Sequence, residues 1–142
     1  MQQKIDRSAI SPDESEKLKD KLADNLQVSD GILEIRQILR HKKRFLDLLL
    51  LADEQESMIN LYLERGEMFA LYDQNILRTI CVVTNEGDKT VELKNIATDP
   101  QYQKLGYGKK LIKFISEHYA GKYDTLLVGT GESPLTVLFY EQ

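Results

Sequence analysis

Gln103-Lys104-Leu105-Gly106-Tyr107-Gly108 joins a strand-like run, residues 91–98, to an amphipathic run, residues 107–119. Glycine allows backbone conformations and close approaches that a Cβ atom would hinder. Two glycines separated by one residue therefore suit a loop whose backbone N–H groups converge on a phosphate, and the following helix would add the positive end of its dipole. The same glycine pair also occurs in ordinary turns, so a plain strand-to-helix connection is the alternative.

The flanking residues make this pattern more specific. Asn95-Ile96-Ala97-Thr98 ends the strand, Asp99-Pro100 follows it, and Gln103-x-x-Gly106-x-Gly108 opens the helix. This segment resembles the acyl-CoA signature of the GNAT superfamily of N-acetyltransferases, and Phe139-Tyr140-Glu141 resembles that family's second landmark. The resemblance covers residues 31–142. It implies an α/β (α+β) fold of the GNAT type, with a mixed, mostly antiparallel central sheet and helices on both faces, and acetyl-CoA as the cosubstrate.

The totals describe an ordinary globular chain of one domain, with 142 residues, 42% of them hydrophobic and 30% charged. The formal net charge of −4 argues against a nucleic-acid partner, for which a basic domain is expected, and is compatible with an amine substrate. A single cysteine, Cys81, excludes an internal disulfide framework and a cysteine-rich zinc site, and no metal is expected. Because the longest apolar run, Leu48 to Ala52, is too short to span a bilayer, we expect a cytoplasmic protein without a membrane partner.

Residues 1–30 are expected to form an extension with one amphipathic helix, and residues 31–142 to form the acyl-CoA-binding domain. Ser11-Pro12-Asp13-Glu14 has the pattern of a helix N-terminus, and Ser29-Asp30-Gly31 is expected to end that helix. Between them, Leu18, Leu22 and Leu26 form a narrow apolar stripe at four-residue spacing. The helix would either lie against the domain or bind a partner chain.

The next part of the chain is expected to begin with a strand, residues 32–39. The basic cluster Arg40-His41-Lys42-Lys43-Arg44 follows, and it is either solvated beside carboxylates or steers an anionic cofactor or substrate. Helices are expected over 45–50 and 53–64, the second with an apolar side formed by Met58, Ile59, Leu61, Tyr62 and Leu63.

Three antiparallel strands are expected next, because residues 67–72 and 76–84 flank the turn Asp73-Gln74-Asn75, and a second turn at 85–88 leads to residues 89–98. A helix over 106–120 and a parallel strand over 123–129 then complete a βαβ unit. Ser133-Pro134 is expected to start a closing helix.

The strand before the loop carries an irregularity. Val91 and Leu93 share one face and Glu92 shares the other with Lys94, yet Asn95 falls on the apolar side and Ile96 on the charged side. One extra residue, a β-bulge near Asn95, would produce this slip of phase. A bulge would splay the strand from its neighbour and leave backbone groups free for a ligand.

The resemblance to the GNAT superfamily also implies which residues hold the cofactor. The backbone at 106–108 would approach the pyrophosphate, with Lys104, Lys109 and Lys110 adding positive charge, while residues 96–98 would pair with the pantetheine arm and bond the thioester oxygen. Ser133 stands where many relatives carry an asparagine, so its contact with the arm is open. The complete set is Ile96, Ala97, Thr98, Gln103, Lys104, Leu105, Gly106, Tyr107, Gly108, Lys109 and Ser133.

Two catalytic roles are implied for an acetyl transfer to an amine. Glu92 is the candidate general base, since it precedes by five residues the position where some relatives place a glutamate; the alternative is that Glu92 only pairs with Lys94 or solvent. Glu67 is a lesser alternative. Tyr140 matches the family tyrosine that protonates the departing sulfur, and a phenol of pKa about 10 suits this role; the alternative is a packing tyrosine.

Relatives normally continue past the tyrosine with two further strands. Without them the strand at 123–129 would leave an apolar sheet edge exposed, so we expect a homodimer or another cover there. Two functions remain open: an N-acetyltransferase acting by direct attack of a primary amine of a small molecule or peptide, or a catalytically inactive acyl-CoA-binding or interaction module.

Overall fold

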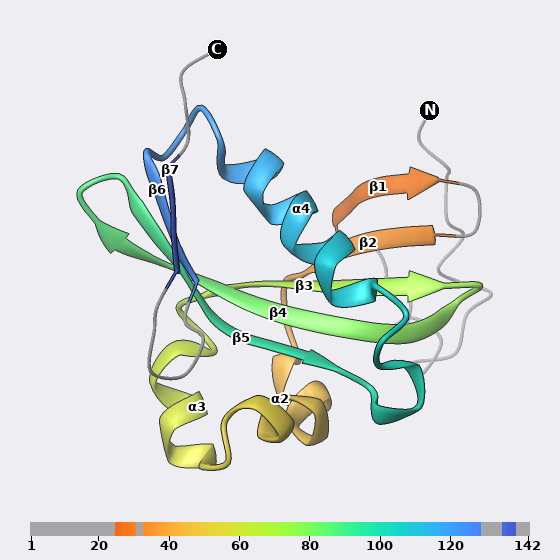
Figure 1. Cartoon of the computed structure of the whole chain (residues 1–142). Coiled ribbons are helices and arrows are strands. Elements are labelled where there is room, and N and C mark those ends of the chain that lie inside the picture. Colours follow the sequence, from red (N-terminus) through yellow and green to blue (C-terminus); the bar gives the residue numbers. More distant parts are fainter. Residues whose placement is uncertain (1–24, 31–32, 129–134, 139–142) are drawn as a thin grey trace, which may run out of the picture.

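The computed structural model describes residues 25–30, 33–128 and 135–138 (Figure 1). Within them one sheet has its strands in sequence order, and all neighbouring strands are antiparallel except β5 and β6, which are parallel. The strands are β1 (Asn25–Asp30), β2 (Leu33–Ile38), β3 (Glu67–Asp73), β4 (Ile76–Gly87), β5 (Thr90–Thr98), β6 (Thr125–Val128) and β7 (Leu135–Leu138). The helices are α2 (Leu46–Ala52), α3 (Glu56–Tyr62) and α4 (Tyr107–Tyr119), with short 3₁₀ helices η2 (Lys42–Phe45) and η3 (Pro100–Tyr102). The expected mixed, mostly antiparallel sheet is confirmed.

Helices cover both faces of the sheet, as expected. Helix α4 lies on one face, and α2 and α3 lie on the other (Figure 1). Phe69 and Leu71 of β3 pack in the core with α4, whereas Met68 and Ala70 pack in the core with α2 and α3. Strand β3 is therefore a nearly continuous apolar run, since both of its faces are buried. No helix of the described residues is long and apolar enough to cross a bilayer.

The β-bulge expected near Asn95 is confirmed. Val82 of β4 pairs with Asn95, and the next residue, Val83, pairs with Leu93, so Lys94 is the extra residue on β5. Strand β6 pairs with β5 from Thr90 to Leu93, so residues 94–98 of β5 extend beyond this described pairing. The bulge thus lies directly after the described part of this pairing.

The bulge also changes the face of β5 on which each later side chain lies. Leu93 packs in the core with α4, and so does Ile96 on the other side of the bulge. Asn95 instead faces α2 and α3, where its Nδ2 donates to the Leu49 carbonyl and to the Tyr62 hydroxyl oxygen, each at 3.0 Å. Asn95 is only 3% exposed, so these bonds offset the cost of burying its amide nitrogen and fix the two helices against the bulge, whereas its Oδ1 has no hydrogen-bond partner among the described residues.

Two segments that were expected to be helical are strands. The helix expected through Leu26 is wrong at its C-terminal end, because Asn25–Asp30 forms β1 and pairs with β2; the earlier part of that helix lies outside the described residues. The closing helix is wrong over Leu135–Leu138, which forms β7 and pairs with β6. Because β7 covers the edge of β6, the reason for expecting a homodimer at that edge no longer holds.

Two smaller differences concern α3 and a turn. Met58 and Leu61 were expected on the buried side of α3 but are 47% and 67% exposed, since the helix buries only the stripe around Ile59. The turn expected at 85–88 falls at Asp88–Lys89 instead, where both residues have positive φ, because β4 continues to Gly87. The first hairpin is confirmed, with Gln74–Asn75 as its two turn residues.

One member of the basic cluster is structural. Lys42 is 6% exposed, and its Nζ donates to the carbonyls of Leu63, Glu64 and Gly66 at 3.1, 3.3 and 2.7 Å. An ammonium at the C-terminal end of α3 satisfies carbonyls that lack an intrahelical partner and complements the negative end of the helix dipole. Burial lowers the pKa of Lys42 from its ordinary value, and the negative charges of Glu64 and Glu67 oppose this effect. The expectation of a solvated cluster is therefore wrong for Lys42.

We expect Lys42→Met to lower the free energy of unfolding by about 3 kcal/mol, because it leaves buried carbonyls without their charged donor. Urea denaturation followed by circular dichroism measures this loss. The matched control is Lys43→Met, since Lys43 forms an exposed pair with Glu56 at 2.7 Å and should cost about 0.5 kcal/mol. Equal effects of the two substitutions would contradict a structural role specific to Lys42.

Candidate active site

The loop between β5 and α4 is built from a short 3₁₀ turn and two left-handed residues. The Asp99 carboxylate accepts from the Gln101 N–H at 2.9 Å and so caps η3, with Pro100 in its first turn. Lys104 and Gly106 then have φ of 68° and 90°, and Gly106 is the N-cap of α4. The positive φ explains the glycine at position 106, because a side chain there would be strained.

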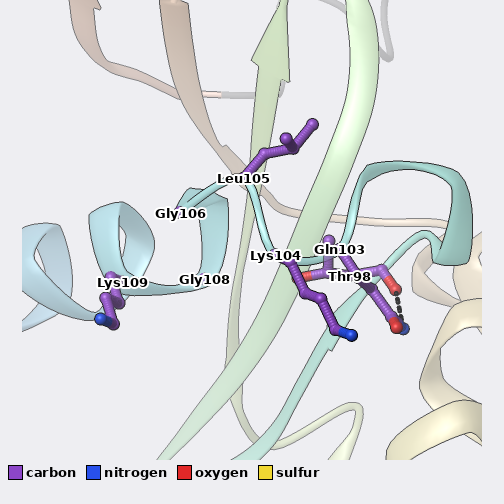
Figure 2. A pocket seen from close by; sticks show the side chains of 7 residues that line it. All are labelled: Thr98, Gln103, Lys104, Leu105, Gly106, Gly108 and Lys109. Atoms are coloured by element: carbon purple, nitrogen blue, oxygen red, sulfur yellow. Dashed lines mark hydrogen bonds between the residues drawn. The ribbon is translucent and has the colours of Figure 1, made fainter.

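An open pocket of about 540 Å³ lies against this loop (Figure 2). The first N–H groups of α4 have no intrahelical partner, which makes the start of the helix suitable for an anion. Figure 2 shows Lys109 on α4 and Lys104 on the loop beside Gln103, and none of the residues lining the pocket is acidic. The lining residues are Thr98, Gln103, Lys104, Leu105, Gly106, Gly108 and Lys109. The loop thus forms a cationic cradle of a size that can hold a pyrophosphate.

A second, smaller pocket of about 130 Å³ continues along the end of β5. It shares Thr98 and Gln103 with the first pocket, and between them the Gln103 Nε2 donates to the Thr98 carbonyl at 3.2 Å. Its other walls are Ile96 and Ala97 of β5 and the end of α2, Leu51 and Ala52. Together the two pockets outline a path from the loop along the strand beyond the bulge.

The structure brings together most of the residues proposed for the cofactor. Nine of them line one or both pockets; Tyr107 does not, because its hydroxyl donates to the Asp73 carboxylate at 2.6 Å, and Ser133 lies outside the described residues. Sequence reasoning missed Leu51 and Ala52, since an apolar run in a short helix indicates core packing and carries no signal for a ligand. Leu51 is in fact 52% exposed.

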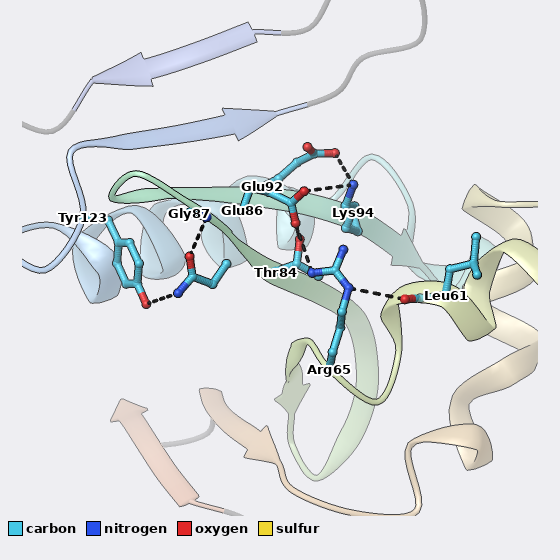
Figure 3. A network of polar contacts seen from close by, with 9 residues as sticks. Leu61, Arg65, Thr84, Glu86, Gly87, Glu92, Lys94 and Tyr123 are labelled. Carbon is cyan, nitrogen blue, oxygen red and sulfur yellow. Dashed lines mark hydrogen bonds and ion pairs between the residues drawn. The ribbon is translucent and has the colours of Figure 1, made fainter.

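Glu92 lies in a network of charges beside the bulge (Figure 3). Its Oε2 is 2.9 Å from the Lys94 Nζ, which lies 3.9 Å from Glu86 Oε1. Glu86 in turn accepts from the Thr84 hydroxyl at 2.7 Å and from Arg65 at 3.1 Å. These partners lower the pKa of Glu86, with the Thr84 hydrogen bond as the largest cause. The alternative interpretation of Glu92, a partner for Lys94, is thus the contact that the structure shows.

The lesser candidate base, Glu67, has other partners. Its carboxylate accepts from the Tyr119 hydroxyl at 2.7 Å and from the Gln37 amide at 3.1 Å. Burial and this bond raise the pKa of Tyr119 far above its usual range, so the hydroxyl stays a donor. Glu67 therefore joins α4 to β2 and β3. Tyr140, the candidate acid, lies outside the described residues, and among those described no cluster of His, Cys, Asp or Glu could hold a metal ion.

Comparisons with known proteins agree with this geometry. Residues 64–142 match the family model of the acetyltransferase (GNAT) domain. An uncharacterized N-acetyltransferase of Bacillus subtilis strain 168, YvbK, is 40% identical over 91 residues, which are 63% of this chain and 58% of YvbK. The chain thus spans less than two thirds of the length of that curated relative.

Three solved structures are similar to the described fold. An IAA acetyltransferase from Bacillus cereus has 34% identity and a TM-score of 0.63, covering 71% of this chain and 67% of its own. A Bacillus subtilis acetyltransferase in complex with CoA has 36% identity and a TM-score of 0.65, with the same coverage. A GNAT family acetyltransferase from Elizabethkingia anophelis with acetyl-CoA bound has 30% identity and a TM-score of 0.64, covering 73% and 69%. The chain belongs to the GNAT acetyltransferase family.

Proposed function

We propose that this chain transfers the acetyl group of acetyl-CoA to a primary amine of a small molecule or peptide by direct nucleophilic attack. The observation that carries the proposal is the cationic pocket at the start of α4, which continues along the end of β5. Relatives of at least 30% identity hold CoA or acetyl-CoA. The residues present here fit that cosubstrate, because Lys104, Lys109 and the start of α4 line an open pocket that has no acidic side chain in its lining.

The cofactor would lie along the two pockets. Backbone N–H groups at the start of α4, with Lys104 and Lys109, would hold the pyrophosphate, and the strand end at 96–98 would hold the pantetheine arm against Leu51 and Ala52. Bound acetyl-CoA supplies an activated thioester carbonyl. A backbone N–H of β5 past the bulge would donate to the carbonyl oxygen, where negative charge develops during attack.

The chain's own side chains would move the protons. As the amine nitrogen bonds to the acetyl carbon and the C–S bond breaks, Glu92 would accept the proton of the amine and Tyr140 would donate one to the sulfur. Glu92 can do so only if its carboxylate leaves Lys94 or reaches the amine while still paired with it. In the second case, Lys94 would hold the Glu92 carboxylate in place beside the bulge.

Isothermal titration of acetyl-CoA into the 142-residue protein tests the cofactor site, and release of free CoA thiol across an amine library tests the reaction. We expect saturable binding and thiol release with a subset of primary amines. Binding without release for any amine would favour the inactive acyl-CoA-binding module instead. If acetyl-CoA does not bind, the proposed function is wrong.

Tyr140→Phe is expected to lower kcat about tenfold, with KM for acetyl-CoA unchanged. This loss is smaller than the usual contribution of a general acid, because a thiol of pKa about 8.5 leaves readily without full protonation. Steady-state assays of thiol release measure it. Tyr123→Phe is a suitable control, since the Tyr123 oxygen accepts only a long bond of 3.5 Å from Asn85 among the described residues. An unchanged kcat in Tyr140→Phe would assign Tyr140 to packing.

A further inference from the structure

A cluster at the end of the β3–β4 hairpin contacts both ends of the cofactor loop. Arg78 of β4 is 9% exposed, and its Cζ lies 4.0 Å from the ring centroid of Tyr102 and 5.5 Å from that of Tyr107. Tyr102 ends η3 and Tyr107 begins α4, so residues 103–106 between them are the loop that lines the pocket. One guanidinium therefore contacts both the residue before the loop and the residue after it.

Asp73, the last residue of β3, connects the hairpin to the start of α4. Its Oδ2 accepts from the Tyr107 hydroxyl at 2.6 Å, and its main-chain carbonyl accepts from Arg78 Nη2 at 3.1 Å. The bond to Asp73 raises the pKa of the Tyr107 hydroxyl, so the tyrosine remains a donor at neutral pH. The Arg78 carbonyl also accepts from the Asp99 N–H at 2.9 Å, where the chain leaves β5.

The division of these contacts indicates what the cluster is for. A buried arginine beside an aspartate usually forms a bidentate pair with the carboxylate. Here Arg78 bonds the Asp73 carbonyl, and the carboxylate serves Tyr107 instead. Within the described residues Arg78 Nε and Asp73 Oδ1 are buried without hydrogen-bond partners, so the position of the guanidinium depends largely on the tyrosine rings.

The loop needs support from outside. Lys104 has a left-handed backbone, φ 68°, which costs a residue other than glycine free energy, and Gly106 is left-handed as well. Among the described contacts, one side-chain bond, from Gln103 to the Thr98 carbonyl, ties the loop itself to β5. Arg78 lines neither pocket, so it does not meet a ligand there directly.

We propose that Arg78 is a positioning residue for the cofactor loop: in contact with the rings of Tyr102 and Tyr107 and hydrogen-bonded to the Asp73 carbonyl, it holds residues 103–106 in the conformation that receives the pyrophosphate. This inference rests on the proposed function, because it needs acetyl-CoA to bind at this loop. It adds the β3–β4 hairpin, which no sequence motif marks, to the parts of the fold that determine affinity for the cofactor.

The test is isothermal titration of acetyl-CoA into wild type, Arg78→Met and Arg78→Lys. We expect Kd to rise about tenfold in both variants, because methionine lacks the charge and the planar stack while lysine keeps only the charge. In turnover, KM for acetyl-CoA should rise with kcat nearly unchanged, a split that general destabilisation would not produce. Arg36→Met is the matched control, since Arg36 lies 4.4 Å over the Tyr72 ring but lines neither pocket; its Kd should equal that of wild type.

Tyr102→Leu provides an independent variant if Arg78→Met fails to fold, because Tyr102 is only partly buried and its loss removes one ring from the stack. We expect it to weaken binding as Arg78→Met does. Wild-type affinity in Arg78→Lys would show that the charge alone acts. Wild-type affinity in both Arg78→Met and Tyr102→Leu would show that the contact with the rings has no role. Either result overturns this inference and leaves the proposed function in place. Absence of binding to wild type would overturn the proposed function with it.

Discussion

Gly108→Glu is expected to weaken acetyl-CoA binding by about 100-fold or more, since like charges about 4 Å apart near a protein surface repel by about 4 kcal/mol. Gly108 lies in the first turn of α4 and lines the larger pocket. A glutamate at a helix N-terminus is favourable to the folded protein, because its charge complements the dipole. The substitution therefore places a carboxylate where the pyrophosphate would lie without removing a contact that the fold needs.

The control for this prediction is Gly108→Ala. A Cβ at this position meets Thr98 Oγ1 at 3.7 Å, an ordinary van der Waals contact, and alanine favours the helix over glycine. We expect the alanine variant to melt no lower than wild type and to bind acetyl-CoA with an affinity much closer to that of wild type than to that of Gly108→Glu. Isothermal titration gives both affinities. If Gly108→Glu binds as tightly as wild type, the pyrophosphate does not lie at this loop.

The sequence predicted the bulge well because its signal is local. Along a strand, side chains alternate between the two faces, so one extra residue must shift every later residue by one position. Asn95 and Ile96 stand out of phase with Val91 and Leu93, and the structure has the extra residue at Lys94. Both faces of β5 carry apolar cores, which explains why Leu93 and Ile96 contact one core while Ala97 contacts the other.

The two helix predictions were wrong because the secondary structure of these segments depends on pairing partners elsewhere in the chain. Leu26 continues a four-residue apolar spacing, and residues 135–138 follow a Ser-Pro pair, so local pattern favours a helix in both places. Residues 25–30 nevertheless pair with β2, and residues 135–138 pair with β6. A short apolar run does not indicate which strand edge is available to it, and this ambiguity limited the prediction at both ends of the sheet.

A similar limit applies to the site. The loop residues could be predicted because they form one motif, whereas Leu51, Asp73 and Arg78 reach the loop from elements distant in the sequence. The structural role of Lys42 could not be predicted for the same reason, since its acceptors, the carbonyls of residues 63, 64 and 66, lie more than twenty residues away in the sequence. Residues that support a motif are found only once the chain has folded.

Glu92→Gln is expected to lower kcat about 100-fold with little change in KM for acetyl-CoA, because a general base contributes about 100-fold or more and an amide cannot accept the proton. Thiol release with an amine from the library screen measures kcat. The matched control is Glu86→Gln, which removes one negative charge from the same network but leaves Glu92 in place, so kcat should stay within about threefold of wild type.

Lys94→Met separates the two interpretations of Glu92. If Glu92 serves only to pair with Lys94 at the bulge, removing either partner breaks the same 2.9 Å contact, and the two variants should lose activity equally. If Glu92 is the base, Lys94→Met leaves a carboxylate that can still accept the proton, and kcat should remain at least about tenfold above that of Glu92→Gln. Equal losses would return Glu92 to a structural role, and the base would have to be sought elsewhere.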